Sequence, residues 1–311
     1  MIAAFISRYG IALALVLEIM LFAILSPFFL TAENLLNVSL QISITAIIAA
    51  GMTFVILTGG IDLSVGSLVA VVGIVATTTL KISAPFPVAF TLALIGGIAF
   101  GAMSGSVAGW FITRAHITPF IVTLALMTVW RGAAFALTQG RPVWELPEGF
   151  SSLANERLLG LPLPTMFMLA VFAVAHIALT KTVFGRYVLA VGGNAEAARL
   201  AGINTRRVLT WVYVLCGALS GFSGILLASR VNSGQPNAGL MYELDVIAAV
   251  VVGGTSLTSG RGSIVGTLLG SLLIGILRNG LNLQNVDSYI QQIVVGVVIL
   301  LAVMLDRYKK K

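Results

Sequence analysis

The sequence predicts an all-α polytopic membrane protein, with residues 1–311 forming one transmembrane domain. Hydrophobic residues make up 58% of the chain and charged residues only 9%, whereas soluble domains carry roughly 25% charged residues. The chain also contains 33 glycines, which are frequent in spanning helices because they let helix backbones approach closely. A chain with so few charges cannot cover a water-facing surface, so we expect it to lie in a lipid bilayer.

Ten apolar runs are long enough to be interpreted as membrane spans, since a spanning helix needs about 20 mostly apolar residues. Several runs are short, and eight or nine spans are also compatible with the pattern. The expected spans are, in chain order, Tyr9–Leu25, Leu40–Leu57, Val65–Leu80, Pro87–Ile112, Pro119–Thr138, Leu163–Leu179, Val208–Ala228, Leu244–Leu257, Ile264–Leu277 and Tyr289–Leu305.

Basic residues concentrate in alternate connecting segments. If the N-terminus is cytoplasmic, the cytoplasmic segments hold twelve of the 18 basic residues but three of the 11 acidic ones. The outer segments then hold five basic and seven acidic residues, including Arg230, Asp245 and Arg278. This asymmetry follows the positive-inside rule, and it predicts an even number of spans with both termini cytoplasmic. It also accounts for the net charge of +7 without nucleic-acid binding.

The longest outer segment, Gln139–Pro164, carries five charges, four prolines and Trp144. We expect it to pack on the membrane surface, with a short helix near Phe150–Leu159. Such a segment either meets an extracytoplasmic partner or caps the helix bundle.

The central polar stretch, Lys181–Arg207, is expected to be a cytoplasmic loop that contains a short helix. Asn194 can cap a helix from Ala195 to about Ala201, and Gly202 suits the left-handed residue that closes it. A capped helix in a basic loop is a candidate docking element, although an ordinary basic cytoplasmic loop fits the composition equally well. Its expected apolar knob is Ala197, Leu200 and Ile203, ringed by Arg199 and Arg206. The candidate docking residues are Gly192, Gly193, Asn194, Glu196, Ala197, Ala198, Arg199, Leu200, Gly202 and Ile203.

A second polar stretch, TGGIDLSVGS at Thr58–Ser67, joins two expected spans. Its paired glycines disfavour a continuous helix, and Asp62 and Ser64 can accept hydrogen bonds from the freed N–H groups. A similar pattern recurs 200 positions later, around Thr258–Leu268, which points to an internal repeat of the kind found in transporters. The stretch is either a gate or a tight interhelical turn. The candidate residues of both copies are Gly59, Gly60, Asp62, Ser64, Gly66, Gly260, Gly262 and Gly266.

The residue patterns of an enzyme, a metal site or a nucleotide site are missing from the sequence. His116 and His176 have no Cys, Asp or Glu at ligand spacing, and no glycine-rich phosphate loop is present. We therefore expect no catalytic residue, no metal and no cofactor. With Asp245 counted as an outer residue, Glu18 and Arg131 are the two Asp, Glu, Lys or Arg residues within the expected spans, fewer than a proton relay usually needs. Each either lines a path or is a satisfied group at a helix contact, so we expect the energy source on another chain.

Three long blocks stand out in the sequence: ILTGGIDLSVGSL at Ile56–Leu68, GRYVLAVGGNAEAARLAGI at Gly185–Ile203, and YELDVIAAVVVGGTSLTSGRGSIVGTL at Tyr242–Leu268. With these blocks the chain resembles, over nearly its full length, the permease subunit of ribose-type ABC importers. The wider family includes permeases for branched-chain amino acids and for autoinducer-2.

The resemblance implies a bacterial cytoplasmic (inner) membrane protein with three kinds of partner. These are a cytoplasmic tandem ABC ATPase, an extracytoplasmic sugar-binding protein, and a second permease subunit, either an identical copy or a sister chain. Glu196-Ala197-Ala198, followed after three residues by Gly202, resembles the ATPase-docking motif of import permeases. That motif continues to Ile-x-Leu-Pro, whereas Val212–Leu215 lacks the proline.

The predicted function is inward movement of a monosaccharide, most simply a ribose-like sugar, by alternating access and without chemistry of its own. The alternatives within transport are autoinducer-2, another pentose or hexose, and a branched-chain amino acid. Outside this class stand an ion-coupled carrier acting alone and a membrane-embedded structural or receptor subunit. The few charges within the spans disfavour the carrier, and the docking loop and glycine-rich turns disfavour the structural subunit.

Overall fold

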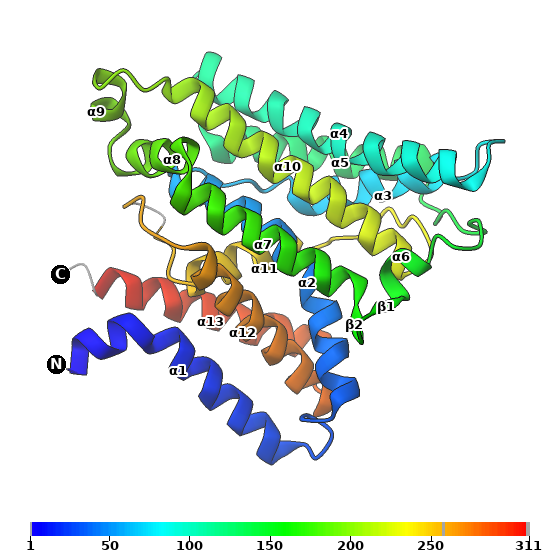
Figure 1. Cartoon of the computed structure of the whole chain (residues 1–311), viewed down its shortest axis with the longest axis horizontal. Coiled ribbons are helices and arrows are strands. Elements are labelled where there is room, and N and C mark those ends of the chain that lie inside the picture. Colours follow the sequence, from blue (N-terminus) through cyan, green and yellow to red (C-terminus); the bar gives the residue numbers. More distant parts are fainter. Residues whose placement is uncertain (1, 257–258, 309–311) are drawn as a thin grey trace.

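The computed structural model describes residues 2–256 and 259–308, and it consists almost entirely of helices (Figure 1). The elements are α1 (Ile2–Leu25), α2 (Ala32–Leu57), α3 (Val65–Thr79), α4 (Phe86–Arg114), α5 (Pro119–Thr138), α6 (Ser152–Asn155), β1 (Arg157–Leu158), β2 (Leu161–Pro162), α7 (Leu163–Lys181), α8 (Val183–Gly193), α9 (Ala195–Leu200), α10 (Thr205–Arg230), α11 (Tyr242–Val252), α12 (Ile264–Leu283) and α13 (Ser288–Tyr308).

Among the described residues, six helices are long and apolar enough to cross a membrane: α2, α4, α5, α7, α10 and α12. Shorter apolar helices lie in α1, α3, α8 and α13. The predicted all-α polytopic membrane architecture is therefore confirmed. The ten expected spans coincide with α1–α5, α7 and α10–α13, but the number ten stays a prediction because α11 has only 11 residues. Leu257, the expected end of the eighth span, and Thr258 lie outside the described residues.

The basic central loop and the two chain ends lie on one side of the bundle. In Figure 1 both ends of the chain and α9 are at the left, whereas α6 and the β1–β2 hairpin are at the right. This arrangement is the one expected for an even number of spans, and the charge asymmetry predicts that the α9 side is cytoplasmic.

The core of the bundle forms around α2. Its residues Ile44, Ile47 and Phe54 are fully buried, and α2 packs against α7, α10, α11 and α12. The hydroxyls of Thr53 and Thr267 lie 2.8 Å apart and join α2 to α12. Because every polar group in a lipid-embedded core needs a partner inside the protein, such contacts are as important as apolar packing here.

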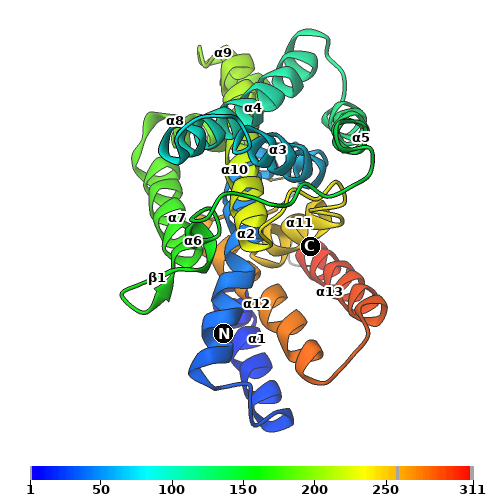
Figure 2. The same ribbon diagram turned by 90° about the vertical axis from the view of Figure 1, so that its right-hand side faces the viewer.

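The closest helix contact joins α4 to α10 (Figure 2). Glycines recur every fourth residue along one face of α4, and there the two backbones touch. A Cβ added at Gly101 would overlap the Gly217 carbonyl oxygen, and one added at Gly105 would overlap the Tyr213 carbonyl oxygen. Small residues allow such close approach in membranes, where packing rather than the hydrophobic effect holds helices together. The glycines of this α4 face are Gly97, Gly101, Gly105 and Gly109.

The connection between α10 and α11 folds back along α3. Gly234 packs against Thr77 near one end of α3, and Gly239 packs against Gly66 near the other. The Arg131 guanidinium of α5 holds this re-entrant segment, residues 231–241, by donating to the Pro236 and Ala238 carbonyl oxygens at 2.8 Å each. Of the two roles considered for Arg131, the structure therefore supports the satisfied structural group. Irregular backbone at membrane depth is tolerated when protein groups satisfy it in this way.

The outer segment differs from its prediction. The helix expected near Phe150–Leu159 is only the four-residue α6, and a β1–β2 hairpin follows it. Leu159 and Gly160 have φ values of 53° and 82°, which is the geometry of a two-residue hairpin turn. The turn makes Arg157 pair with Pro162, so the chain reverses where a longer helix was expected.

We predict that Gly101→Ala destabilises the protein by about 1–3 kcal/mol, because the added methyl group forces the α4 and α10 backbones apart. Gly96→Ala is the matched control: it lies on the same helix, and a Cβ there meets nothing within 4 Å. The control should be neutral, or stabilising by up to about 1 kcal/mol. The measurement is the thermal unfolding midpoint in detergent micelles, and equal midpoints for both variants would contradict the contact.

Candidate functional site

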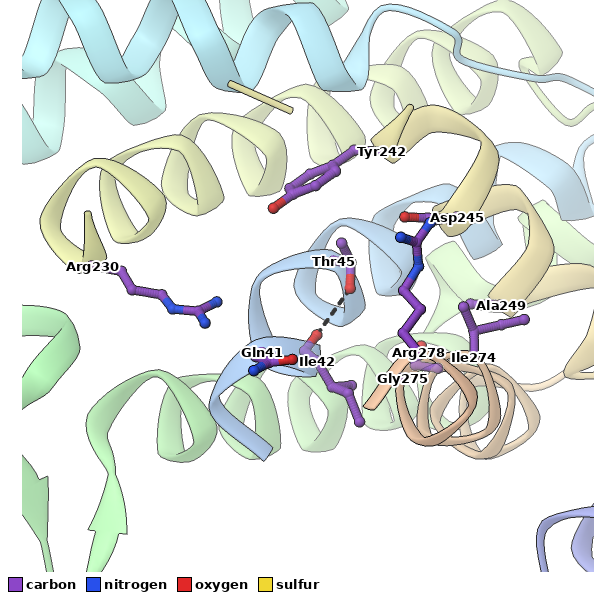
Figure 3. A pocket seen from close by; sticks show the side chains of 11 residues that line it. Gln41, Ile42, Thr45, Arg230, Tyr242, Asp245, Ala249, Ile274, Gly275 and Arg278 are labelled. Atoms are coloured by element: carbon purple, nitrogen blue, oxygen red, sulfur yellow. Dashed lines mark hydrogen bonds and ion pairs between the residues drawn. The ribbon is translucent and has the colours of Figure 1, made fainter. Parts of the chain in front are cut away.

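A polar pocket of about 210 Å³ lies among α2, α10, α11 and α12 (Figure 3). It is on the side of the bundle away from α9, beside the C-terminal ends of α10 and α12. Its lining residues are Gln41, Ile42, Thr45, Arg230, Tyr242, Asp245, Ala249, Ser271, Ile274, Gly275 and Arg278.

An ion pair forms one wall of this pocket. An Arg278 Nη2 of α12 donates to Asp245 Oδ1 of α11 at 2.5 Å, and the Asp245 side chain is only 11% exposed. Figure 3 shows Arg278 reaching across to Asp245, with Arg230 and Gln41 on the opposite side of the pocket. The Nε of Arg278 is buried and has no hydrogen-bond partner among the described residues. Ionisable groups are costly within a membrane, so their convergence marks a functional site.

The chemistry of the pocket suits a small neutral solute with several hydroxyl groups. Guanidinium and amide groups supply donors, the Asp245 carboxylate supplies acceptors, and Thr45 and Tyr242 supply hydroxyls that act as either. Apolar residues such as Ile42 and Ile274 complete the lining, as is usual for small-molecule sites. Among the described residues no group of three or more His, Cys, Asp or Glu side chains could hold a metal ion.

Sequence reasoning missed this pocket because it assigned Arg230, Asp245 and Arg278 to outer segments. The helices extend further than the expected spans: α10 ends at Arg230, α11 begins at Tyr242, and α12 runs five residues past Arg278. An expected span ends at a charged residue, because the mean hydropathy falls there. The helix itself continues when the charged side chain finds a partner inside the protein. The feature of the sequence that could have indicated the pocket was an isolated charged residue at the edge of an apolar run.

The α2–α3 turn has the predicted break in the helix. Gly59 has a φ of 80°, and a Cβ at Gly60 would overlap the Tyr213 hydroxyl. The buried Asp62 Oδ1 accepts from both the Ser64 N–H at 2.9 Å and the Ser64 hydroxyl at 2.6 Å. Asp62 therefore caps the turn as expected. The Ser64 side chain was expected to accept as well, but it makes no cap hydrogen bond at the start of α3, and its hydroxyl donates to Asp62.

Two groups of candidate residues meet on the α9 side of the bundle. A Cβ at Gly192, from the docking set, would overlap the Leu57 carbonyl oxygen and lie 3.0 Å from the Gly260 Cα. Gly260, from the turn set, has a φ of 61° and packs on the Gly192 backbone in return. The end of α2, the end of α8 and the loop before α12 are therefore in direct contact, which we name the glycine junction (Leu57, Gly192 and Gly260).

The remaining turn residues lie elsewhere. Gly66 faces the re-entrant segment, Gly262 packs on the Thr255 side chain, and Gly266 packs on the Gly253 carbonyl group. In the two copies of the internal repeat, the helix that follows the turn begins at nearly equivalent residues, Val65 in α3 and Ile264 in α12. The helix that precedes the turn differs, because α11 is much shorter than α2.

The docking helix α9 has the predicted caps. Asn194 Oδ1 accepts from the Ala197 N–H at 2.9 Å, and Gly202 closes the helix with a φ of 85°. The Gly202 and Ile203 N–H groups donate to the Arg199 and Ala198 carbonyl oxygens, a pattern that satisfies the last carbonyls of a helix.

The exposed face of α9 differs from the expected knob. Ala198 is 5% exposed and Ile203 is half-buried against the core, so both hold α9 onto the bundle. Leu200 is 75% exposed, and Ala197 is exposed beside it. Glu196 and Arg199 form an exposed ion pair at 2.6 Å, and the hydrogen bond from Arg199 lowers the pKa of the Glu196 carboxyl. The exposed surface of α9 therefore consists of two apolar residues, Ala197 and Leu200, beside the Glu196–Arg199 ion pair.

Residues 34–303 match the family described as the permease component of branched-chain amino acid transport systems. The chain is 47% identical to the ribose import permease protein RbsC of Bacillus subtilis (strain 168), over 97% of this chain and 93% of that protein. It is also 47% identical to the ribose import permease protein RbsC of Escherichia coli (strain K12), over 96% of this chain and 93% of that protein.

The L-arabinose ABC transporter permease protein AraH of Azospirillum brasilense is 42% identical, over 98% of this chain and 89% of that protein. No solved structure matches the chain. Since the family match covers most of the chain and these permeases match it nearly end to end, the chain belongs to the family of branched-chain amino acid transport system permease components.

Proposed function

We propose that this chain is the permease subunit of an ABC importer that carries a ribose-like monosaccharide into the cytoplasm. The observation that carries the proposal is the 47% identity to ribose import permeases over nearly the whole chain. As a member of its family, the chain is a multi-pass membrane protein and a transport subunit rather than an enzyme. Another pentose is the second candidate substrate, because the L-arabinose permease is 42% identical.

The polar pocket is the proposed passage for the sugar. It combines donors, acceptors and an aromatic ring on the side of the bundle away from α9. The charge asymmetry predicts that this is the outer side, where a solute delivered from outside arrives first. Substrate sites of transporters commonly lie among broken helices within the membrane, and α11 with its re-entrant approach has that form. An extracytoplasmic sugar-binding protein is the proposed donor of the substrate, and a second permease, identical or a sister chain, completes the path.

The α9 surface is the proposed contact with a cytoplasmic tandem ATPase. A small apolar centre with a charged rim is a common anatomy for a strong contact, and Ala197, Leu200 and the Glu196–Arg199 pair have this arrangement. Movement of α9 and α8 would act on the glycine junction, because Gly192 touches both Leu57 and Gly260. The junction lies at one end of α2, and the pocket residues lie further along the helix, with Thr45 at its middle and Gln41 one turn beyond.

The substrate proposal predicts that the importer, reconstituted in proteoliposomes with its ATPase and binding protein, accumulates labelled ribose when ATP is supplied. Unlabelled ribose should compete best, L-arabinose less well, and leucine not at all. Competition by leucine alone would replace the sugar with a branched-chain amino acid. Uptake without ATP but with an ion gradient would replace the importer with an ion-coupled carrier.

For the pocket, we predict that the double variant Asp245→Asn/Arg278→Gln inserts and unfolds as the parent does but loses ribose uptake by about tenfold or more. Removing both partners of a buried ion pair is close to neutral for stability, whereas removing one costs about 3–5 kcal/mol. The double variant therefore separates transport from folding, which neither single variant does. Asp287→Asn, an exposed outer carboxylate, is the matched control. Normal uptake by the double variant would remove the pocket from the path.

For the docking surface, we predict that Gly202→Val and Ala197→Glu insert normally yet lose ATPase co-purification and sugar-stimulated ATP hydrolysis. A β-branched residue resists the positive φ of Gly202, and a glutamate at position 197 places an unpaired charge in the contact. The matched controls are Gly202→Asn, which tolerates positive φ, and Ala197→Ser. Unchanged ATPase binding by both test variants would return this loop to an ordinary cytoplasmic connection.

A further inference from the structure

A basic groove lies between the cytoplasmic ends of α4 and α10, away from the polar pocket. Its volume is about 630 Å³. Its floor is the close helix contact at Gly109, where an added Cβ would lie 2.8 Å from the Thr210 Cα. The lining residues are Ser106, Trp110, Thr113 and Arg114 of α4, and Asn204, Arg206, Arg207, Thr210, Trp211 and Val214 of α10.

The charge in this groove is of one sign. Three arginines line it, Arg114, Arg206 and Arg207, and no acidic residue does. All three are exposed, and none has an ion-pair partner in the described part of the chain. The planar guanidinium fork matches the geometry of a phosphate group. Such a cluster attracts an anion and favours one whose oxygens accept several hydrogen bonds at once.

Two tryptophans flank the groove. Trp110 is 55% exposed and Trp211 is 60% exposed, so large indole rings stand on the surface instead of packing in the core. Trp is enriched at the membrane–water boundary because its ring is apolar and its N–H is polar. Arginines beside exposed tryptophans are therefore the composition typical of the depth where lipid headgroups meet a membrane protein.

We propose that this groove binds the phosphate headgroup of an anionic phospholipid of the cytoplasmic leaflet, such as phosphatidylglycerol. The arginines hold the phosphate, and the tryptophan rings pack along the glycerol and upper acyl chain. Basic pockets between spanning helices on the cytoplasmic side have this chemistry. A symmetric contact with a second copy of the chain fits less well, because a two-fold axis would bring the arginine clusters of both copies together.

The test is lipid retention by the purified full-length permease, titrated with phosphatidylglycerol or phosphatidylcholine of equal acyl chains and assayed by native mass spectrometry. The parent should retain phosphatidylglycerol preferentially. Arg114→Gln/Arg206→Gln/Arg207→Gln should lower its apparent affinity by roughly 100-fold at low ionic strength. The preference should also weaken as salt is added.

The matched control is Lys81→Gln/Arg141→Gln/Arg157→Gln, which removes the same charge from exposed residues of the outer segments. It should bind phosphatidylglycerol as the parent does. Trp110→Leu/Trp211→Leu keeps every charge and should lower retention by a smaller factor. Thermal unfolding midpoints equal to that of the parent show that each variant is folded.

Five results would overturn the proposal. They are equal retention of the two lipids by the parent, parent-like retention by the arginine variant, and equal losses in the test and control triples. The fourth is displacement of the lipid by millimolar inorganic phosphate, which would make the groove a phosphate site instead. Disulfide cross-linking of the Trp211→Cys variant, made in a Cys216→Ala background, tests whether a second permease occupies the groove. Efficient disulfide formation between two copies in phosphatidylglycerol nanodiscs would assign the groove to that contact.

Discussion

The backbone contact between α4 and α10 is the constraint on which the rest of this bundle depends. In lipid there is no hydrophobic force to press helices together, so close packing must supply the attraction. The glycine face of α4 allows that packing by leaving room for the α10 carbonyl groups. Once α10 is fixed, its C-terminal end carries Arg230 to the polar pocket, and its N-terminal end carries Trp211 and the basic groove. The contact between α4 and α10 thus positions the polar pocket at one end of α10 and the basic groove at the other.

Helix α2 connects the α9 side of the bundle to the pocket. One end of it touches Gly192 and Gly260 in the glycine junction, and Thr45 at its middle and Gln41 one turn beyond line the pocket. Because α2 is buried along most of its length, it is held on all sides and acts as a rigid element. Under the proposed docking of an ATPase at α9, these backbone contacts are the proposed route from the docking surface to the pocket.

The charges of the pocket are tolerated because the helices around them are interrupted nearby, and the irregular backbone lets charged side chains find partners inside the protein. The re-entrant segment shortens α11, which begins at Tyr242 beside the membrane-embedded part of α3. That arrangement places Asp245 within reach of Arg278 on α12, so the carboxylate is compensated. Arg131, also inside the membrane by sequence, is used to fasten the same segment. Polar groups in this bundle therefore serve two purposes, holding irregular backbone and lining the polar pocket.

The sequence by itself determined the elements that depend on neighbouring residues. Apolar runs placed the helices, Asn194 and Gly202 placed the caps of α9, and Gly59 placed the break after α2, since each rests on contiguous residues. Tertiary structure alone decided which distant residues meet: Asp245 with Arg278, Gly192 with Gly260, and Ala198 with the core instead of a partner. Hydropathy and local propensity carry no information on such pairs, because the free energy that selects them comes from packing between helices far apart in the chain.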